Sequence, residues 1–244
     1  MTSRSVDLSP RKAALVAGFG YLGILVVNTI ALSLVDGLIV RGDAASTASK
    51  ITASQSLFRF GIASWIVVLA LDAVVAWALY IFLEPVDRHL SMLAAWFRLV
   101  FVAIAGSALV GLLSASRLLG TAGASTAFGP DQFAALAMLS LYPYEYAFNV
   151  GFVFFGLHIL CVGYLILKSD YVPRLLGVLL MVASAGYFID SFASVVSSGY
   201  ADNQALFIVF VAVPALVAEY SLAFWLLIKG GKGERRENPA PEAA

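Results

Sequence analysis

Charged residues are scarce in this chain. Asp, Glu, Lys and Arg make up 12% of its 244 residues, whereas hydrophobic residues make up 61%. The mean hydropathy is +0.92. A soluble globular domain carries about twice that fraction of charge, so the composition excludes this class and indicates an integral membrane protein. The net charge is zero, which leaves no excess of basic residues to bind nucleic acid.

Cysteine and histidine are almost absent as well. Cys161 is the only cysteine, which excludes an intrachain disulfide and a thiolate-rich metal site. His89 and His158 are the only histidines, and His89 falls in a polar turn, so a haem held by two buried histidines is excluded. One histidine with two carboxylates (His158, Asp72 and Glu219) is the remaining zinc hypothesis, but catalytic zinc sites commonly use more histidines. We therefore predict no metal and no cofactor.

Long apolar runs, in contrast, are abundant. A helix needs about 20 apolar residues to cross a bilayer, and six runs are long enough: 13–35, 60–83, 90–113, 146–167, 175–198 and 206–228. The first run exceeds the ~7–15 apolar residues of a signal peptide, so we interpret it as a span. The sequence predicts an all-α integral membrane protein with six transmembrane helices in one domain, 11–229. Residues 1–10 form a predicted N-terminal tail, and 230–244 a disordered C-terminal tail.

Two long connections hold further helix signals. In the first, 36–56, Asp43 can cap a short helix that begins at the next residue. In the second, a loop rich in Gly, Ala, Ser and Thr at 119–130 precedes a short apolar stretch, 132–141, which Pro143 follows. Ten residues in a helix span only about 15 Å, too little to cross the bilayer. We predict short surface or re-entrant helices in both connections.

The positions of lysine and arginine predict the orientation. Of the 15 Lys and Arg residues, Arg98 lies within a span, and only Arg41, Lys50, Arg59 and Arg117 lie on the side opposite to the termini. Cytoplasmic loops carry the excess of Lys and Arg in membrane proteins. We therefore predict a multi-pass protein of the cytoplasmic membrane with both termini inside.

Ionisable residues within the spans fall into two layers. Counting about 1.5 Å per residue from the cytoplasmic turns places Asp72, Arg98, His158 and Glu219 roughly 13–18 Å deep. This inner layer is the predicted binding site, because buried ionisable groups in membranes are by default functional candidates. The alternative is a structural clamp in which Asp72 pairs with Arg98 and Glu219 with His158. A weaker outer layer contains Arg59, Glu145 and Asp190, with Asn28 and Asn149 nearby.

Several segments form a specific pattern: SLFR at 56–59, FRL at 97–99, GFVFFGLHILCVGYLILKSDYVPRLLGVLL at 151–180, GYFIDSF at 186–192 and Ala218-Glu219. This pattern resembles the bacterial domain-of-unknown-function family 4386, over nearly the whole chain. The resemblance implies a bacterial multi-pass membrane protein without an assigned activity. It assigns no role to the charged residues at matching positions: Arg59, Asp72, Arg98, His158, Asp190 and Glu219.

Three functional hypotheses follow. The leading one is binding or transport of a small, protonatable or amphipathic solute through the inner layer. The second is a membrane-embedded enzyme that acts on lipid through His158 with Asp72 or Glu219. The third is a non-catalytic accessory or sensor subunit whose ionic layers are structural. The expected partners are the lipid bilayer and an unidentified small molecule; no catalytic residue is predicted, and the sequence favours a non-enzymatic role.

Overall fold

The computed structural model describes residues 9–121, 128–197 and 199–231, and every regular element among them is helical. The elements are α1 (Pro10–Val35), the 3₁₀ turn η1 (Asp36–Leu38), α2 (Ala44–Ala53), α3 (Gln55–Leu83), α4 (Arg88–Thr121), α5 (Pro130–Lys168), α6 (Arg174–Val196) and α7 (Tyr200–Ile228). Within this described part, six helices are long and apolar enough to cross a membrane: α1, α3, α4, α5, α6 and α7. The predicted all-α fold is therefore confirmed, and the chain is a multi-pass membrane protein. Most of the predicted tails, at 1–8 and 232–244, lies outside the described residues.

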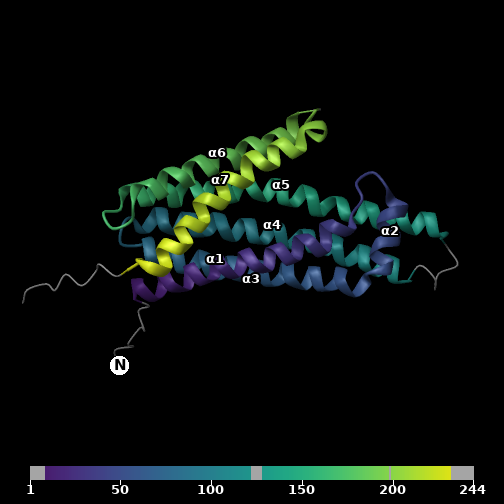
Figure 1. The fold of residues 1–244 in the computed structure, drawn as a ribbon, viewed down its shortest axis with the longest axis horizontal. Coiled ribbons are helices and arrows are strands. Elements are labelled where there is room, and N and C mark those ends of the chain that lie inside the picture. Colours follow the sequence, from purple (N-terminus) through teal and green to yellow (C-terminus); the bar gives the residue numbers. More distant parts are fainter. Residues whose placement is uncertain (1–8, 122–127, 198, 232–244) are drawn as a thin grey trace, which may run out of the picture.

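The six long helices form a ring. Each packs against its neighbours in the chain, and α7 closes the ring on α1. Figure 1 shows α1 beginning and α7 ending at the same end of the bundle, near the turns 84–87 and 169–173. We call this the terminal end, and the opposite end, where α2 lies, the distal end. The positive-inside prediction would place the terminal end in the cytoplasm.

Arg11 closes the ring at the terminal end. Its guanidinium donates hydrogen bonds to the carbonyl oxygens of Leu226 at 3.1 Å, Leu227 at 2.7 Å and Gly230 at 2.7 Å. Carbonyls in the last turn of a helix have no partner within it, and a cation also interacts favourably with that end of the helix dipole. A single side chain at the start of α1 therefore supplies hydrogen-bond donors to the carbonyl groups at the end of α7. Toward the distal end α7 diverges from α1, as Figure 1 shows.

Helix starts follow the caps in the sequence. Pro10 opens α1 after Ser9, whose hydroxyl accepts a hydrogen bond from the backbone of Lys12 at 3.4 Å. Asp43 caps α2 by accepting the backbone N–H of Ser46 at 2.8 Å. The short helix that we predicted in the first connection is thus present.

The second predicted short helix is wrong. Residues 132–141 belong to α5, a continuous helix of 39 residues that passes through Pro143. Its length of about 58 Å exceeds the ~30 Å hydrocarbon core, so it extends well beyond one crossing. Pro143 costs one backbone hydrogen bond. Packing of α5 along α4, including contact of Ser140 and Pro143 with the position of Gly111, accounts for the uninterrupted helix. The loop predicted at 119–130 begins later, because α4 runs to Thr121, and 122–127 lie outside the described residues.

Backbone contact between α5 and α6 depends on two glycines. A Cβ atom at Gly163 would lie 2.9 Å from the carbonyl oxygen of Gly177, and one at Gly177 would lie 2.7 Å from that of Gly163. Both distances are too short for a carbon and an oxygen that are not bonded. Small residues at such crossings let membrane helices approach closely. This crossing holds α5 and α6 together near the terminal end.

Candidate functional site

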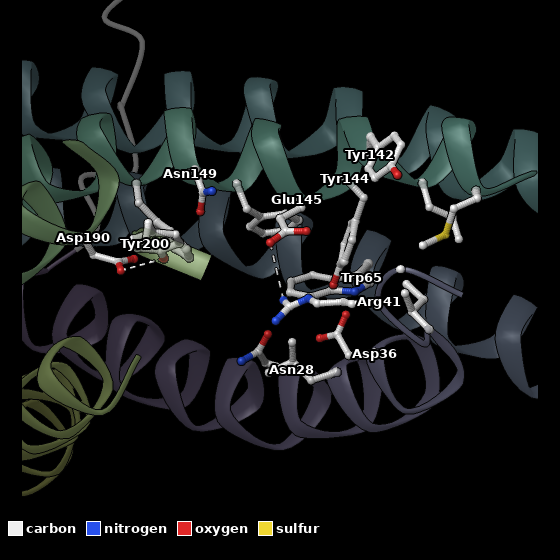
Figure 2. A pocket seen from close by; sticks show the side chains of 17 residues that line it. Asn28, Asp36, Arg41, Trp65, Tyr142, Tyr144, Glu145, Asn149, Asp190 and Tyr200 are labelled. Carbon is white, nitrogen blue, oxygen red and sulfur yellow. Dashed lines mark hydrogen bonds and ion pairs between the residues drawn. The ribbon is translucent and has the colours of Figure 1, made fainter. Parts of the chain in front are cut away.

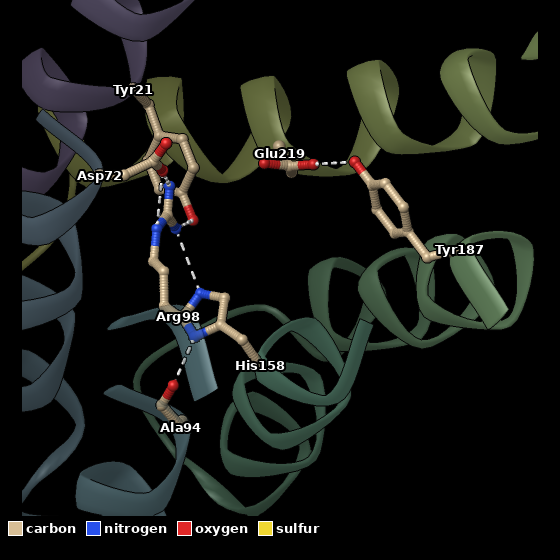
Figure 3. Close-up of polar contacts among 7 residues, drawn as sticks. All are labelled: Tyr21, Asp72, Ala94, Arg98, His158, Tyr187 and Glu219. Atoms are coloured by element: carbon tan, nitrogen blue, oxygen red, sulfur yellow. Dashed lines mark hydrogen bonds and ion pairs between the residues drawn. The ribbon is translucent and has the colours of Figure 1, made fainter. Parts of the chain in front are cut away.

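The guanidinium of Arg98, on α4, lies at the centre of the bundle, and only 1% of the residue is exposed. Its Nε donates to Oδ1 of Asp72 on α3 over 2.9 Å, and Nη2 donates to the same oxygen. Nη1 donates to the hydroxyl of Tyr21 on α1 over 2.9 Å (Figure 3). The rings of Tyr21 and Phe155 flank the cation, with centroids 5.0 and 5.2 Å from it. The pairing of Asp72 with Arg98 is therefore present, as a buried ion pair.

His158, on α5, joins the same contacts. Its Nε2 lies 3.1 Å from Nη1 of Arg98, and its Nδ1 lies 2.9 Å from the carbonyl oxygen of Ala94. A guanidinium only donates and a carbonyl only accepts, so Nε2 must accept and Nδ1 must carry the hydrogen. These partners fix one neutral tautomer of the imidazole. The pairing of His158 with Glu219 in the clamp hypothesis is wrong.

Glu219 has a different partner. The hydroxyl of Tyr187 on α6 donates to its Oε1 over 3.0 Å, across the interface with α7 (Figure 3). We call Tyr21, Asp72, Arg98, His158, Tyr187 and Glu219 the inner network. Its hydrogen bonds join α1, α3, α4 and α5 through Arg98, and α6 to α7 through Tyr187. All six spans thus contribute a side chain, and the inner network includes the four predicted inner-layer residues.

A layer of aromatic rings covers the distal side of the inner network. It consists of Phe101, Phe148, Phe152, Phe155 and Tyr187, and we call it the aromatic layer. Ring centroids are 5.0 Å apart for Phe101 and Phe155, 5.4 Å for Phe152 and Tyr187, and 5.2 Å for Phe155 and Tyr187. Phe155 touches Arg98 from this side, whereas Phe148 and Phe152 face the other way, into a cavity. Aromatic bulk therefore separates that cavity from the inner network.

The cavity, which we call the distal cavity, has a volume of about 800 Å³. Its walls come from α1, α3, α5, α6, α7 and the segment 36–42 that follows α1 (Figure 2). The described residues that line it include six aromatic side chains: Trp65, Tyr142, Tyr144, Phe148, Phe152 and Tyr200. Its polar lining consists of Asn28, Asp36, Arg41, Glu145, Asn149 and Asp190. Small-molecule sites in proteins typically measure about 300–1,000 Å³ and combine apolar walls with a few polar groups, as this cavity does.

Charges in the distal cavity are unequal in number. Among the described residues that line it, three are carboxylic acids and one, Arg41, is basic. Nη2 of Arg41 lies 3.5 Å from Oε1 of Glu145, and Asp190 accepts a hydrogen bond from the hydroxyl of Tyr200 at 2.9 Å. The indole nitrogen of Trp65 is buried and has no hydrogen-bond acceptor within the described part of the chain. The lining thus presents an excess of negative charge, aromatic faces and one unsatisfied donor.

The structure gathers most of the predicted outer layer in this cavity, but not all of it. Glu145, Asp190, Asn28 and Asn149 line it together, whereas Arg59 lies elsewhere. Nε of Arg59 donates to the hydroxyl of a serine on α4 at 3.3 Å. Depth in a span fixes position along the membrane normal but not around the helix axis, so a residue of the predicted outer layer can lie outside the cavity.

Sequence reasoning missed several residues at both levels. Asp36 and Arg41 follow α1 in a polar connection, and nothing in their spacing indicated that this segment folds over the cavity. Tyr21, Tyr187 and Tyr200 carry no formal charge. Within apolar runs they therefore did not stand out as candidate site residues, as the charged residues did. Among the described residues, no group of three His, Cys, Asp or Glu side chains is arranged to hold a metal ion.

Most of the chain is similar to known protein sequences. The family described as Domain of unknown function (DUF4386) matches residues 16–230, and these contain both the inner network and the distal cavity. A relative from Archaeoglobus fulgidus, described as an uncharacterized protein, is 34% identical over 173 residues. The aligned part covers 71% of this chain and 85% of that protein. No solved structure matches the chain.

Proposed function

The chain belongs to the DUF4386 family, and we propose that it binds a small amphipathic solute with a cationic group in the distal cavity. The lining of this cavity is the observation that carries the proposal. Aromatic side chains supply apolar surface and electron-rich faces, and cations bind over such faces. Among the described lining residues, three carboxylic acids against one guanidinium favour a positively charged ligand over a negatively charged one.

Two features favour the distal cavity over the inner network as the binding site. Arg98 already bonds to Asp72, Tyr21 and His158, and Glu219 accepts a hydrogen bond from Tyr187, so a ligand would have to compete with these contacts. The distal cavity offers volume, and its Trp65 nitrogen lacks a hydrogen-bond acceptor among the residues that the structure describes. We therefore assign the inner network a structural role, in which Arg98 joins α1, α3, α4 and α5 and Tyr187 joins α6 to α7. This agrees with the clamp hypothesis for Asp72 and Arg98 but gives His158 and Glu219 different partners.

The side chains of the distal cavity and of the inner network are better suited to binding than to catalysis. An enzyme acting on lipid would need a base or nucleophile that reaches its substrate. His158 has both ring nitrogens engaged and lies behind the aromatic layer. A protein that binds this solute could also transport it. Transport would require the aromatic layer to open, because in this conformation Phe148 and Phe152 form one wall of the cavity.

The test uses two probes of the same shape and opposite charge. Tetraphenylphosphonium is an aromatic cation, and tetraphenylborate is the matching anion. The full-length protein in detergent or nanodiscs should bind the cation saturably and much more tightly than the anion. Removing one carboxylate, by Glu145→Gln or Asp190→Asn, should weaken cation binding about tenfold, equivalent to about 1.4 kcal/mol.

A matched control separates the cavity from general electrostatics. Glu84 lies at the terminal end, far from the cavity, where it pairs with Arg88 at 3.3 Å. Glu84→Gln removes the same charge as Glu145→Gln and should leave the dissociation constant unchanged. Equal binding of cation and anion, or equal effects of the two substitutions, would refute the proposed site.

A further inference from the structure

The cation that now faces the carboxylates of the distal cavity belongs to the protein itself. Figure 2 shows the guanidinium of Arg41 inside the cavity, between Glu145 on α5 and the side chains of Asn28 and Asp36. The Arg41 Nη2 to Glu145 Oε1 distance is 3.5 Å, and Asp36 also feels the charge of Arg41. A positively charged ligand would therefore meet a site in which a guanidinium already occupies the position beside Glu145.

The backbone before Arg41 is anchored firmly. The Thr47 hydroxyl, on α2, accepts the N–H of Val40 at 2.9 Å and donates to the Val40 carbonyl at 3.0 Å. Thr47 is 1% exposed, so this anchor is part of the packed structure. Gly42 follows with φ of 77°, a conformation that glycine adopts without strain. The fold thus fixes where the Arg41 side chain starts and directs it over the cavity.

The ion pair itself is weak. The side chains of Arg41 and Glu145 are 63% and 42% exposed, and ion pairs in such surroundings contribute little stability. Arg41 also has a long side chain with several rotatable bonds, so it can move out of the cavity without movement of its backbone. A fixed attachment point and a solvent-exposed ion pair are features of a displaceable occupant.

We propose that Arg41 is a tethered competitor, which occupies the cation position of the distal cavity and is displaced when a cationic ligand binds. This inference rests on the proposed function, because it takes the carboxylate side of the cavity to be the ligand site. Arg41 then sets the affinity: it keeps weak cations out and leaves the carboxylates paired when the cavity has no ligand.

The experiment measures tetraphenylphosphonium binding by full-length variants. Arg41→Gln should bind it about tenfold more tightly than the wild type, the effect expected when one like charge leaves a partly solvated site. Arg41→Lys keeps the charge and should stay near wild-type affinity. Arg59→Gln is the matched control: it removes one guanidinium at the distal end but outside the cavity, and should change little.

The outcomes separate the two proposals. Absence of binding to the wild type and to Arg41→Gln alike would refute the proposed function. Binding with unchanged or weaker affinity in Arg41→Gln, or an equal gain in Arg59→Gln, would refute the competitor role alone. Thr47→Val provides an independent route if Arg41→Gln does not accumulate. It frees the Val40 anchor and should raise affinity in the same direction by a smaller factor, and no gain would again refute the role.

Discussion

Removing either charge of the Asp72–Arg98 pair should destabilise the protein strongly. Asp72→Asn leaves the guanidinium of Arg98 buried, with 1% of the residue exposed, and without its hydrogen-bonded counter-charge, so that Glu219 is the carboxylate that remains near it. Arg98→Met leaves the carboxylate buried and also removes the partner of Tyr21 and of His158 Nε2. Breaking a buried ion pair by removing one partner costs about 3–5 kcal/mol, because an uncompensated charge stays buried.

The double variant distinguishes an interacting pair from two separate losses. With both charges of the pair removed, neither is left buried without the other. The loss in free energy of unfolding should therefore be well below the sum of the losses in the two single variants. The partners lost by Tyr21 and His158 are the same in both backgrounds and cancel in the comparison. We expect a coupling energy of about 2–3 kcal/mol, the upper part of the range found for residues in one network.

Reversible unfolding in mixed micelles, followed by circular dichroism, measures the four free energies. The pair Glu84–Arg88 at the terminal end is the control, because its side chains are 39% and 72% exposed at 3.3 Å separation. Its coupling should stay below about 1 kcal/mol. Additivity at Asp72 and Arg98 within about 0.5 kcal/mol would show that the pair does not hold these helices together.

Three further predictions concern topology, packing and pH. In a variant without the native cysteine, a cysteine at Ala45 should react with an impermeant thiol reagent in intact cells and one at His89 should not; the reverse pattern would overturn the orientation. Gly177→Ala places a Cβ 2.7 Å from a carbonyl oxygen of α5 and should cost about 1–3 kcal/mol of stability, whereas Gly37→Ala, with no atom within 4 Å of the new Cβ, should leave the melting temperature unchanged. The pKa of Asp87 is lowered because its carboxylate accepts a backbone N–H at the start of α4; its stabilising effect is therefore present above the ordinary value of about 3.9 and lost as pH falls through the lower folded value. The melting temperature of wild type should exceed that of Asp87→Asn at neutral pH, with the gap closing only below about pH 4; a gap that closes near pH 6 would contradict this assignment.

Much of the fold could be predicted from the sequence because a membrane-spanning helix is recognised from the length and polarity of one continuous segment. Apolar length gives the spans, and capping residues such as Ser9 and Asp43 give helix starts that the structure reproduces. The continuity of α5 could not be read in this way. Proline predicts a lost hydrogen bond at Pro143, but only the packing partner decides whether the helix ends there.

The candidate site was harder to predict because depth is a single coordinate. Depth grouped the inner-layer residues correctly and suggested the Asp72–Arg98 pair, since α3 and α4 are joined by a tight turn. It could not tell that Glu219 faces Tyr187 rather than His158, which depends on rotation about the axis of α7. Depth also gave no information about Arg41, because the position of Arg41 depends on a loop that folds back over the bundle.

Crystals of the protein with tetraphenylarsonium would test the central claim most directly, because arsenic gives an anomalous signal that marks the position of the cation. We predict one dominant anomalous peak in the distal cavity, among Trp65, Glu145 and Asp190, with the side chain of Arg41 withdrawn from Glu145. Arsenic beside His158 in the inner network, or only along the lipid-facing surfaces of the helices, would contradict the assignment of the distal cavity as the binding site.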